Sequence, residues 1–261
     1  MQYSAGCSFY RAHARFCIVT CIIADHARRH TIPFMCGRFA STHSPHQLQQ
    51  WYDALAMPDF PLRYNIAPAS FIAAIRRVAE GRIGSRMRWG FIPSWAKDPA
   101  SMPMLHNARG ETVNDRPMFR TAFRRRRCLI PASGFYEWKA VQGQKSKQPF
   151  YISLKDGSPM SFAGLWDTAR TAEGDTIETC TIITTDANAV LAPIHNRMPV
   201  IIDRKDWDTW LGAESSADDT EVEMLSGLLV PFETGNMQVW GVAHAVNKVT
   251  NDNPALLAPI A

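Results

Sequence analysis

The sequence has no apolar run close to the roughly 20 residues that a membrane-spanning helix needs, and its most apolar early stretch, residues 17–24, is far shorter. Its six cysteines include no Cys-x-x-Cys pair, so a structural zinc site is not indicated. The 15 glycines are spread along the chain and form no nucleotide-binding fingerprint. We therefore expect no membrane segment, no metal and no small-molecule cofactor.

The composition is that of an ordinary globular protein. The 261 residues are 46% hydrophobic and 20% charged, and this length suits a sizeable core without disulfide bridges. We expect reduced thiols, a cytoplasmic location and a monomer. The net charge of +4 is too small to indicate nucleic-acid binding by itself. Arginines cluster in two stretches, however, at 76, 77, 82, 86 and 88 and at 116, 120 and 124–127. Each cluster suits either a basic groove or a solvated face.

Residues 1–34 differ from the rest of the chain in amino-acid composition. They contain four arginines, three histidines, three cysteines and a single acid, Asp25, but no long amphipathic helix and no small-residue cleavage site. Regular patterning begins at Met35. We interpret residues 1–34 as an N-terminal extension, either disordered or produced by a wrongly assigned start codon, and residues 35–261 as one domain.

Short apolar runs separated by turns dominate the rest of the chain. Ser44-Pro45 followed by apolar residues at helical spacing predicts a helix over 45–56. Further helices are predicted at 116–123, 186–191, 207–211 and 219–229. Strands are predicted at 71–78, 82–89, 127–130, 134–139, 150–154, 161–166, 178–184, 199–202 and 238–242. This pattern predicts an α+β domain on a curved, largely antiparallel, barrel-like sheet with flanking helices.

Cys36 follows Met35, and cells remove an initiator methionine that precedes a small residue. Cys36 would then carry a free α-amine next to its thiol. The amine can condense with an aldehyde to an imine, and the thiol can close onto the imine carbon to form a thiazolidine. An α-amine has a pKa of about 7.7–8.0, so part of it is neutral and nucleophilic near pH 7. The alternative is that Cys36 is an ordinary buried residue.

Six motifs occur in order along the chain: MCGRFA at 35–40, RYNIAPA at 63–69, RWGFIPSWAKD at 88–98, NARGET at 107–112, CLIPASGFYEWK at 128–139 and HNRMPVII at 195–202. This set closely resembles the SRAP family, the abasic-site processing proteins also called SOS-response-associated peptidases. The resemblance runs from Met35 to near the C-terminus. It implies a function in the DNA-damage response on single-stranded DNA that contains abasic sites, with the protein associated with the nucleoid when DNA is bound.

The resemblance also implies roles for particular residues. Cys36 matches the N-terminal cysteine that bonds to the ring-opened abasic deoxyribose, and Glu137 and His195 match the active-site glutamate and histidine. Asn107 matches the asparagine that holds the reacting sugar. The remaining matches concern DNA contacts, with phosphates for two arginines and bases for a proline and a tryptophan: Arg38, Arg109, Pro68 and Trp95.

The chemistry of these residue types agrees with the implied roles. Release of the aldehyde from a closed sugar requires a proton to move on and off the ring oxygen, and a histidine with a pKa of about 6.5 suits that step. Glu137 lies between Tyr136 and Trp138, and partial burial would raise its pKa and let it accept a proton from the amine. Without the resemblance, Glu137 could equally be a solvent-facing carboxylate on a strand.

Two other functions remain open at this stage. Cys36, His195 and Glu137 could form a triad-like set in a cysteine peptidase that processes its own N-terminus. The arginines and tryptophans would also suit a passive binder of single-stranded nucleic acid. Replacement of Cys36 by serine separates the three, because passive binding survives it and crosslinking does not.

Overall fold

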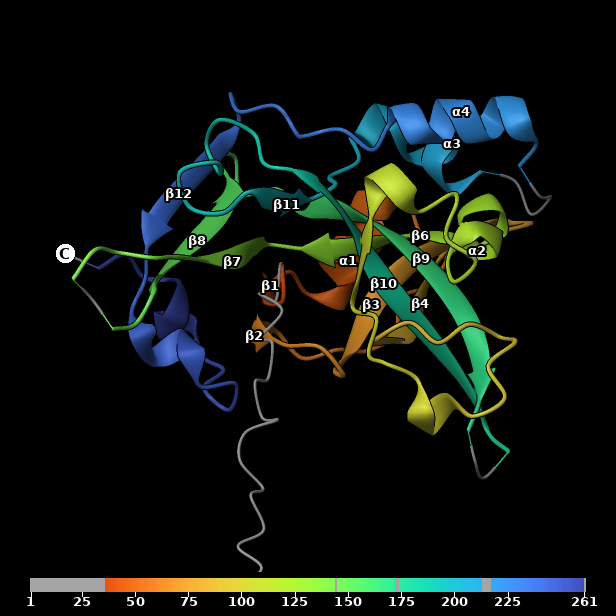
Figure 1. Ribbon diagram of the computed structural model, residues 1–261, viewed down its shortest axis with the longest axis horizontal. Coiled ribbons are helices and arrows are strands. Elements are labelled where there is room, and N and C mark those ends of the chain that lie inside the picture. The colour runs from red at the N-terminus through yellow and green to blue at the C-terminus, as the bar shows by residue number, and fades with distance from the viewer. Residues whose placement is uncertain (1–35, 144, 172–173, 213–216, 261) are drawn as a thin grey trace, which may run out of the picture. The chain divides into compact units, whose positions relative to one another are not determined.

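A computed structural model describes residues 36–143, 145–171, 174–212 and 217–260 (Figure 1). The predicted extension over residues 1–34 lies outside the described residues. Within these ranges, no helix is long and apolar enough to cross a membrane.

Five strands close into a barrel. They are β3 (Phe71–Val78), β4 (Gly81–Trp89), β6 (Arg127–Ala132), β9 (Met160–Arg170) and β10 (Thr176–Asp186). The ring runs β3–β4–β10–β9–β6 and returns to β3, with every pairing antiparallel except β4–β10. Two short strands, β5 (Asn107–Arg109) and β11 (Arg197–Pro199), add to β10. The predicted α+β fold on a curved, barrel-like sheet is therefore confirmed.

A second, antiparallel sheet carries the N-terminal strand. Its order is β12 (Met237–Gly241), β8 (Gln148–Leu154), β7 (Gly134–Lys139), β1 (Phe39–Ser41) and β2 (Arg63–Ile66). In Figure 1 these strands lie to the left of β10 and β9. Because β6 leads into β7 after a break of one residue, Ser133, the two sheets are continuous in the chain.

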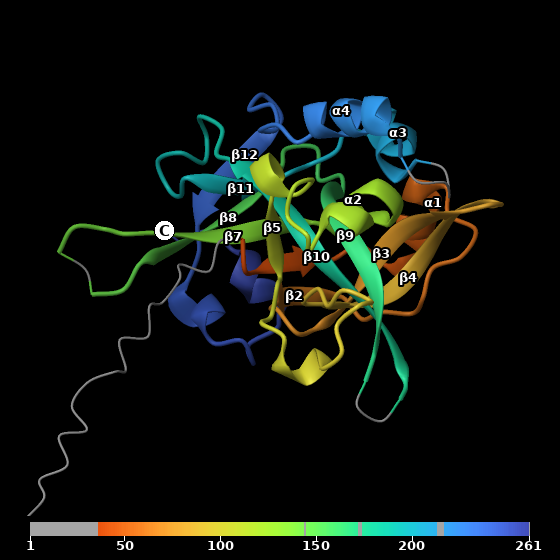
Figure 2. The same cartoon turned by 45° about the vertical axis from the view of Figure 1, so that its right-hand side comes forward.

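Alternation along the barrel strands divides the core into two parts. Ile72, Met87, Ile130 and Phe162 belong to a cluster that fills the barrel and packs against the second sheet. The residues between them, such as Leu129, face outward into a second cluster. This outer cluster is covered by α1 (Pro45–Tyr52), α2 (Arg120–Arg125), α3 (Trp207–Leu211) and α4 (Asp219–Gly227), which Figure 2 shows around β3, β9 and β10.

Helix α1 begins where the sequence predicted and ends earlier. Ser44 and Gln47 form a capping box, and Pro45 occupies the first turn. Asp53 adopts the left-handed conformation (φ 49°) and stops the helix after Tyr52, so the predicted end at residue 56 is wrong. The reason is tertiary, because Ala54 then forms a bridge with Arg82 of β4.

The predicted helix over 186–191 is also wrong. Strand β10 runs to Asp186, and turns follow. The side-chain oxygen of Asn188 accepts the N–H groups of Val190 and Leu191, both at 3.1 Å, which competes with helical hydrogen bonding. The predicted strand over 199–202 lies instead at 197–199.

The three- and four-residue strands β1, β2 and β5 were not predicted, because they are too short to show an alternating pattern of apolar and polar residues. Short 3-10 helices complete the described structure, at Pro99–Ser101, Gly110–Thr112, Arg204–Asp206, His244–Asn247 and Pro254–Leu257.

Candidate active site

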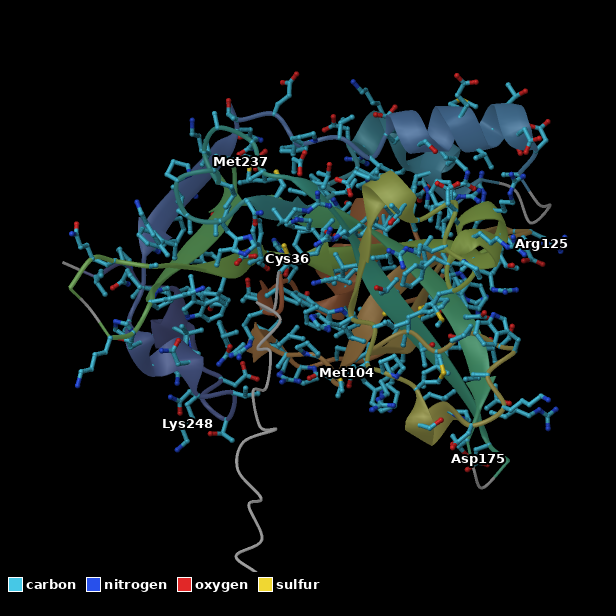
Figure 3. The ribbon with its side chains drawn as sticks, viewed as in Figure 1. Cys36, Met104, Arg125, Asp175, Met237 and Lys248 are labelled. Atoms are coloured by element: carbon cyan, nitrogen blue, oxygen red, sulfur yellow. The ribbon has the colours of Figure 1, made fainter. Side chains whose placement is uncertain are left out.

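Sheet register brings Cys36 to Glu137. Strand β1 pairs antiparallel with β7, with Phe39 opposite Phe135, so the residues before Phe39 run alongside those after Phe135. The backbone N–H of Cys36 donates to Oε1 of Glu137 at 2.8 Å. Both residues are buried, at 4% and 1% exposure. Figure 3 labels Cys36 beside the end of the β7 ribbon, near the centre of the view.

Burial of the Glu137 carboxyl disfavours its charged form more than the neighbouring groups favour it. Burial raises its pKa above the ordinary value, because desolvation penalises the charged form. Proximity to His195 and hydrogen bonds from the Cys36 thiol and backbone act in the opposite direction. The side chain is therefore suited to take up and release a proton, which is the property that the sequence had predicted for it.

The Cys36 thiol is held in its protonated form. Burial raises its pKa well above the ordinary value, and the Glu137 carboxylate and its hydrogen bond raise it further, against a smaller opposing effect of Arg197. The backbone at Cys36 has a φ of 45°, in the left-handed region that non-glycine residues seldom occupy. A buried thiol with a raised pKa is a weak nucleophile at neutral pH.

His195 joins the same cluster from the turn that follows β10. Its backbone N–H donates to the carbonyl of Leu191 at 2.9 Å. Its ring Nδ1 accepts the backbone N–H of Arg197 at 3.1 Å. With Nδ1 accepting this N–H, the neutral ring carries its hydrogen on Nε2, where it can donate a hydrogen bond to a substrate; Nδ1 also lies 3.4 Å from the carbonyl oxygen of Arg197.

Arg197 and Glu111 are site residues that the sequence analysis did not single out. The Arg197 guanidinium is buried and binds both carboxylate oxygens of Glu111, at 2.5 and 2.9 Å, together with Asp186 at 2.8 Å. Hydrogen bonds from Arg197 hold the pKa of Glu111 below its ordinary value. Both residues lie inside motifs quoted above, NARGET and HNRMPVII, so their place in those motifs was an available signal.

Asn107 and Arg109 reach the site region on β5, which pairs in parallel with β10. Asn107 is half-buried at the first position of the strand, and Arg109 is exposed at the last. Thr184 is opposite Arg109 and also accepts from Arg197 through its carbonyl at 2.7 Å. Strand β10 therefore connects Asn107 and Arg109 to the segment that carries His195.

Arg38 is largely engaged within the protein. Its Nη1 donates to Oδ1 of Asn65 at 2.7 Å and to the carbonyl of Val246 at 2.9 Å, and its guanidinium lies 5.8 Å from the centre of the Trp138 ring. Desolvation lowers its pKa. Asn65 is fully buried, and its amide nitrogen also donates to the carbonyls of Val246, Lys248 and Asn251. The predicted phosphate ligand thus also links β1 to the C-terminal segment.

Pro68 and Trp95 lie outside the buried cluster, at the same end of hairpin β3–β4. Pro68 and Ala69 form the turn before β3, in which Ala69 has a φ of 71°. The Ala69 N–H donates to the carbonyl of Trp89, the last residue of β4, at 2.7 Å. Trp95 follows in the loop after β4 and is 57% exposed. An exposed tryptophan on a loop is available to a ligand rather than to the core.

The run Arg124–Arg127 is mostly used for internal contacts. Arg124 pairs with Asp219 at 2.7 Å and Arg126 with Asp167 at 3.1 Å. Arg127 is buried and donates to the carbonyls of Trp210 and Phe123. Of these four arginines only Arg125 is exposed, and Figure 3 shows it at the right-hand edge of the view, whereas Cys36 lies near the centre. This run does not form the basic groove that the sequence allowed. Across the described ranges, no group of three or more potential metal ligands occurs.

Comparison with known proteins identifies the family. The sequence model of the family "SOS response associated peptidase (SRAP)" matches residues 35–249. The chain belongs to the SRAP family. Abasic site processing protein YoqW of Bacillus subtilis is 36% identical over 227 residues, which cover 85% of this chain and 99% of the relative. Abasic site processing protein YedK of Escherichia coli is 32% identical over 237 residues, covering 87% and 100%.

Solved structures share the SRAP fold seen here. A protein from Bacteroides thetaiotaomicron superposes with a TM-score of 0.75 at 24% identity, covering 87% of this chain and all of that one. A protein from Bordetella bronchiseptica has a TM-score of 0.69 at 26% identity, covering 80% and 100%. Because the identity to the Bacteroides thetaiotaomicron protein is only 24%, that similarity shows the fold alone.

Proposed function

We propose that this SRAP protein senses abasic sites in single-stranded DNA and bonds to them covalently through Cys36. The names of its relatives, abasic site processing proteins, support DNA with abasic sites as the substrate. The observation that carries the proposal is the 2.8 Å hydrogen bond between the Cys36 nitrogen and the buried Glu137 carboxylate, with His195 in the same cluster. The reacting nitrogen, an acceptor for its proton and a proton donor for the sugar thereby share one site.

The proposed reaction has two bond-forming steps. First, the α-amine of Cys36 adds to the aldehyde carbon of the ring-opened sugar, and loss of one water gives an imine. Second, the thiol sulfur adds to the imine carbon while its proton passes to the nitrogen, which closes the thiazolidine. The amine acts first because the pKa of the thiol is raised well above its ordinary value. No oxidant or cofactor is consumed.

Glu137 and His195 handle the protons of these steps. Glu137 accepts the backbone N–H of Cys36 in the structure, and once that nitrogen is a free amine it takes a proton from it and returns one as water leaves. His195 donates a proton to the ring oxygen of the closed sugar while the anomeric hydroxyl gives up its own proton, so the ring C–O bond breaks, the aldehyde is released and the histidine is reprotonated with no net change in protons. Asn107 holds the sugar, Arg38 and Arg109 contact phosphates, and Pro68 and Trp95 separate the neighbouring bases.

The proposal requires a free α-amine on Cys36. Either translation starts at Met35 and the methionine is removed, or a cleavage before Cys36 removes residues 1–35. Residues 1–35 lie outside the described part of the chain. The intact mass of protein purified from its native host tests this requirement. A peptide that continues from residue 20 to residue 40 in crosslinking-active protein would contradict it.

Incubation with an oligonucleotide that carries one abasic site tests the reaction itself. The adduct should survive denaturing electrophoresis and weigh one water less than protein plus DNA. Cys36→Ser keeps the amine and loses the thiol, so it should form only an imine, which survives when borohydride reduces it and otherwise hydrolyses. A Cys36→Ser adduct as stable as that of the wild type would rule out the thiazolidine. Binding with no adduct in the wild type would favour passive binding.

The peptidase alternative is less well supported. A cysteine peptidase needs a thiolate with a lowered pKa, normally paired with histidine. Here the thiol is hydrogen-bonded to a carboxylate and its pKa is raised. Cleavage of a peptide panel by the mature protein, lost in Cys36→Ser, would restore that alternative.

A further inference from the structure

Hairpin β3–β4 carries two kinds of arginine. Those at the tip of the hairpin are paired with acids: Arg76 with Glu178 at 3.4 Å, and Arg77 and Arg82 with Asp208. The side chains of Arg86 and Arg88, toward the other end, form no ion pair and no hydrogen bond with any residue that the structure describes. The positive charge at that end therefore has no acidic partner among the described residues.

An exposed aromatic ring lies beside these two arginines. Phe71 is 40% exposed, and the guanidinium of Arg86 lies over its ring, 4.3 Å from the centroid. Arg88 is directly opposite Phe71 in the ladder. All three side chains are on the outward face, because the alternating residues Ile72 and Met87 belong to the barrel core. Arg86 is itself exposed, and an exposed guanidinium–ring pair is a surface on which a nucleobase can stack.

This surface continues from the proposed wedge. The Trp89 N–H donates to the carbonyl of Ser70 at 2.9 Å, and the Ala69 N–H donates to the carbonyl of Trp89, so the turn that carries Pro68 is fixed to the end of the hairpin. Phe71 follows this turn directly. A strand whose bases are separated at Pro68 is thus led onto Phe71, Arg86 and Arg88.

We propose that Phe71, Arg86 and Arg88 form a second contact for DNA, which binds an unpaired nucleotide next to the abasic site. The base stacks on the Arg86–Phe71 pair, and Arg88 contacts a phosphate. Charge complementarity favours a nucleic acid over a protein partner, because the two cations make no ion pair with any described residue while those at the hairpin tip do. This inference rests on the proposed function, since it takes Pro68 as the point where the strand opens.

Crosslinking of oligonucleotides of different lengths tests the contact. One substrate has about one nucleotide on each side of the abasic site, and two others extend one side by about six, near the footprint of a small single-strand binding module. At protein concentrations below saturation, the wild type should react faster when one particular side is extended. Phe71→Ala and Arg86→Gln should lose that gain, by about fivefold or more, and should match the wild type on the short substrate.

Two variants provide matched controls. Arg125→Gln removes an exposed arginine on the far side from Cys36, and Val230→Ala removes an exposed apolar side chain. Both should keep the full gain. Arg88→Gln should also lower the salt dependence of binding to undamaged single strands, by about 0.7 in the slope of log K against log salt. Equal melting temperatures for all variants would show that each is folded.

The outcomes separate the two proposals. If Phe71→Ala and Arg86→Gln gain as much from extension as the wild type, the second contact is wrong while the crosslinking function stands. If the wild type forms no adduct with any substrate, the proposed function is wrong. Binding of undamaged strands then still decides the contact, because unchanged affinity in Phe71→Ala would overturn it.

Discussion

At the scale of single residues, the site combines groups that are costly to bury. Glu137 is almost fully buried with a raised pKa, Cys36 is buried at a φ of 45°, and Arg197 is buried between Glu111 and Asp186. Each of these lowers stability unless its neighbours compensate. Their concentration around one backbone nitrogen is typical of a catalytic site rather than of a core.

Replacement of Glu137 by glutamine should slow crosslinking by about a hundred- to ten-thousand-fold, the usual range for a lost acid–base group. The loss should be greatest where Glu137 is ionised while part of the α-amine is still protonated, because only the carboxylate form can accept the proton of the amine. Binding to undamaged DNA should be nearly unchanged. The measurement is the crosslinking rate from pH 6 to 8. Equal rates for Glu137→Gln and the wild type over this range would remove Glu137 from the mechanism.

Replacement of His195 by glutamine should slow both formation and reversal of the crosslink, because each requires a proton at a leaving atom. Asn107→Ala should behave differently, with weaker substrate positioning and an unchanged pH profile. Rates of adduct formation and of release from purified adduct measure the two steps. A His195→Gln protein that releases DNA as fast as the wild type would contradict the role in reversal.

The same carboxyl should make stability depend on pH. Because the folded-state pKa of Glu137 is raised above its ordinary value of 4.5, the folded protein holds this proton at pH values where the unfolded chain has lost it. The contribution of Glu137 to stability is thus greatest below pH 4.5 and falls as pH rises toward the folded-state pKa. Glu137→Gln should therefore gain thermal stability relative to the wild type as pH increases through this window. Parallel melting curves at pH 4, 5.5 and 7 with a constant difference would contradict this expectation.

At the scale of elements, a three-residue strand positions the reacting residue. Strand β1 lies between β2 and β7, and the segment that follows β12 is fastened to it through Asn65 and Arg38. Side-chain hydrogen bonds of the buried Asn65 add to the short β1–β2 ladder, which has too few backbone hydrogen bonds to fix β1 by itself. The position of Cys36 therefore depends on residues more than 200 positions later in the sequence.

Asn65→Ala should destabilise the protein by about 2–4 kcal/mol, because it removes a fully buried amide that accepts from Arg38 and shares its two N–H hydrogens among three backbone carbonyls. Urea unfolding measures the change. Asn236→Ala, at an exposed position, is the matched control and should stay within about 0.5 kcal/mol of the wild type. A loss for Asn65→Ala no larger than that of the control would contradict the role of this residue.

At the scale of the whole molecule, exposed aromatic and basic groups gather at one end of the β3–β4 hairpin, whereas the longest arginine run is used to fasten helices to the barrel. Trp95 and Phe71 are exposed there, and Arg124, Arg126 and Arg127 are engaged elsewhere. The proposed DNA contact is therefore inferred from arginines that lack acidic partners among the described residues, and not from the number of arginines in a stretch.

Single-stranded abasic DNA should react faster than fully paired abasic DNA, because Pro68 and Trp95 block continued stacking. Encounter with either should weaken as salt rises, since each phosphate contact on a single strand adds about 0.7 to the slope of log K against log salt. Rates on matched single-stranded, junction and duplex substrates test this. Equal rates on duplex and single strands would show that the wedge is wrong.

Most of the fold was predictable from local pattern. Strands β3 and β7 and helix α3 lie at the predicted bounds, because alternation or a run of large apolar residues fixed both ends of each. The failures were at places where a side chain or a distant strand competes with the local pattern, as at Asn188 and Ala54. Barrel closure could be expected from the strand count, but the order of the strands could not.

The sequence by itself determined the family and the type of fold and gave the candidate site residues, because these depend on residues and spacings along the chain. Only the tertiary structure decided that Cys36 and Glu137 share a hydrogen bond, that Arg197 binds both carboxylate oxygens of Glu111, and which arginines make no ion pair with a described residue. Burial and distance depend on pairings between residues far apart in the chain, such as Cys36 and Glu137 across the β1–β7 ladder. These pairings set the pKa values on which the proposed chemistry depends, and no local pattern encodes them.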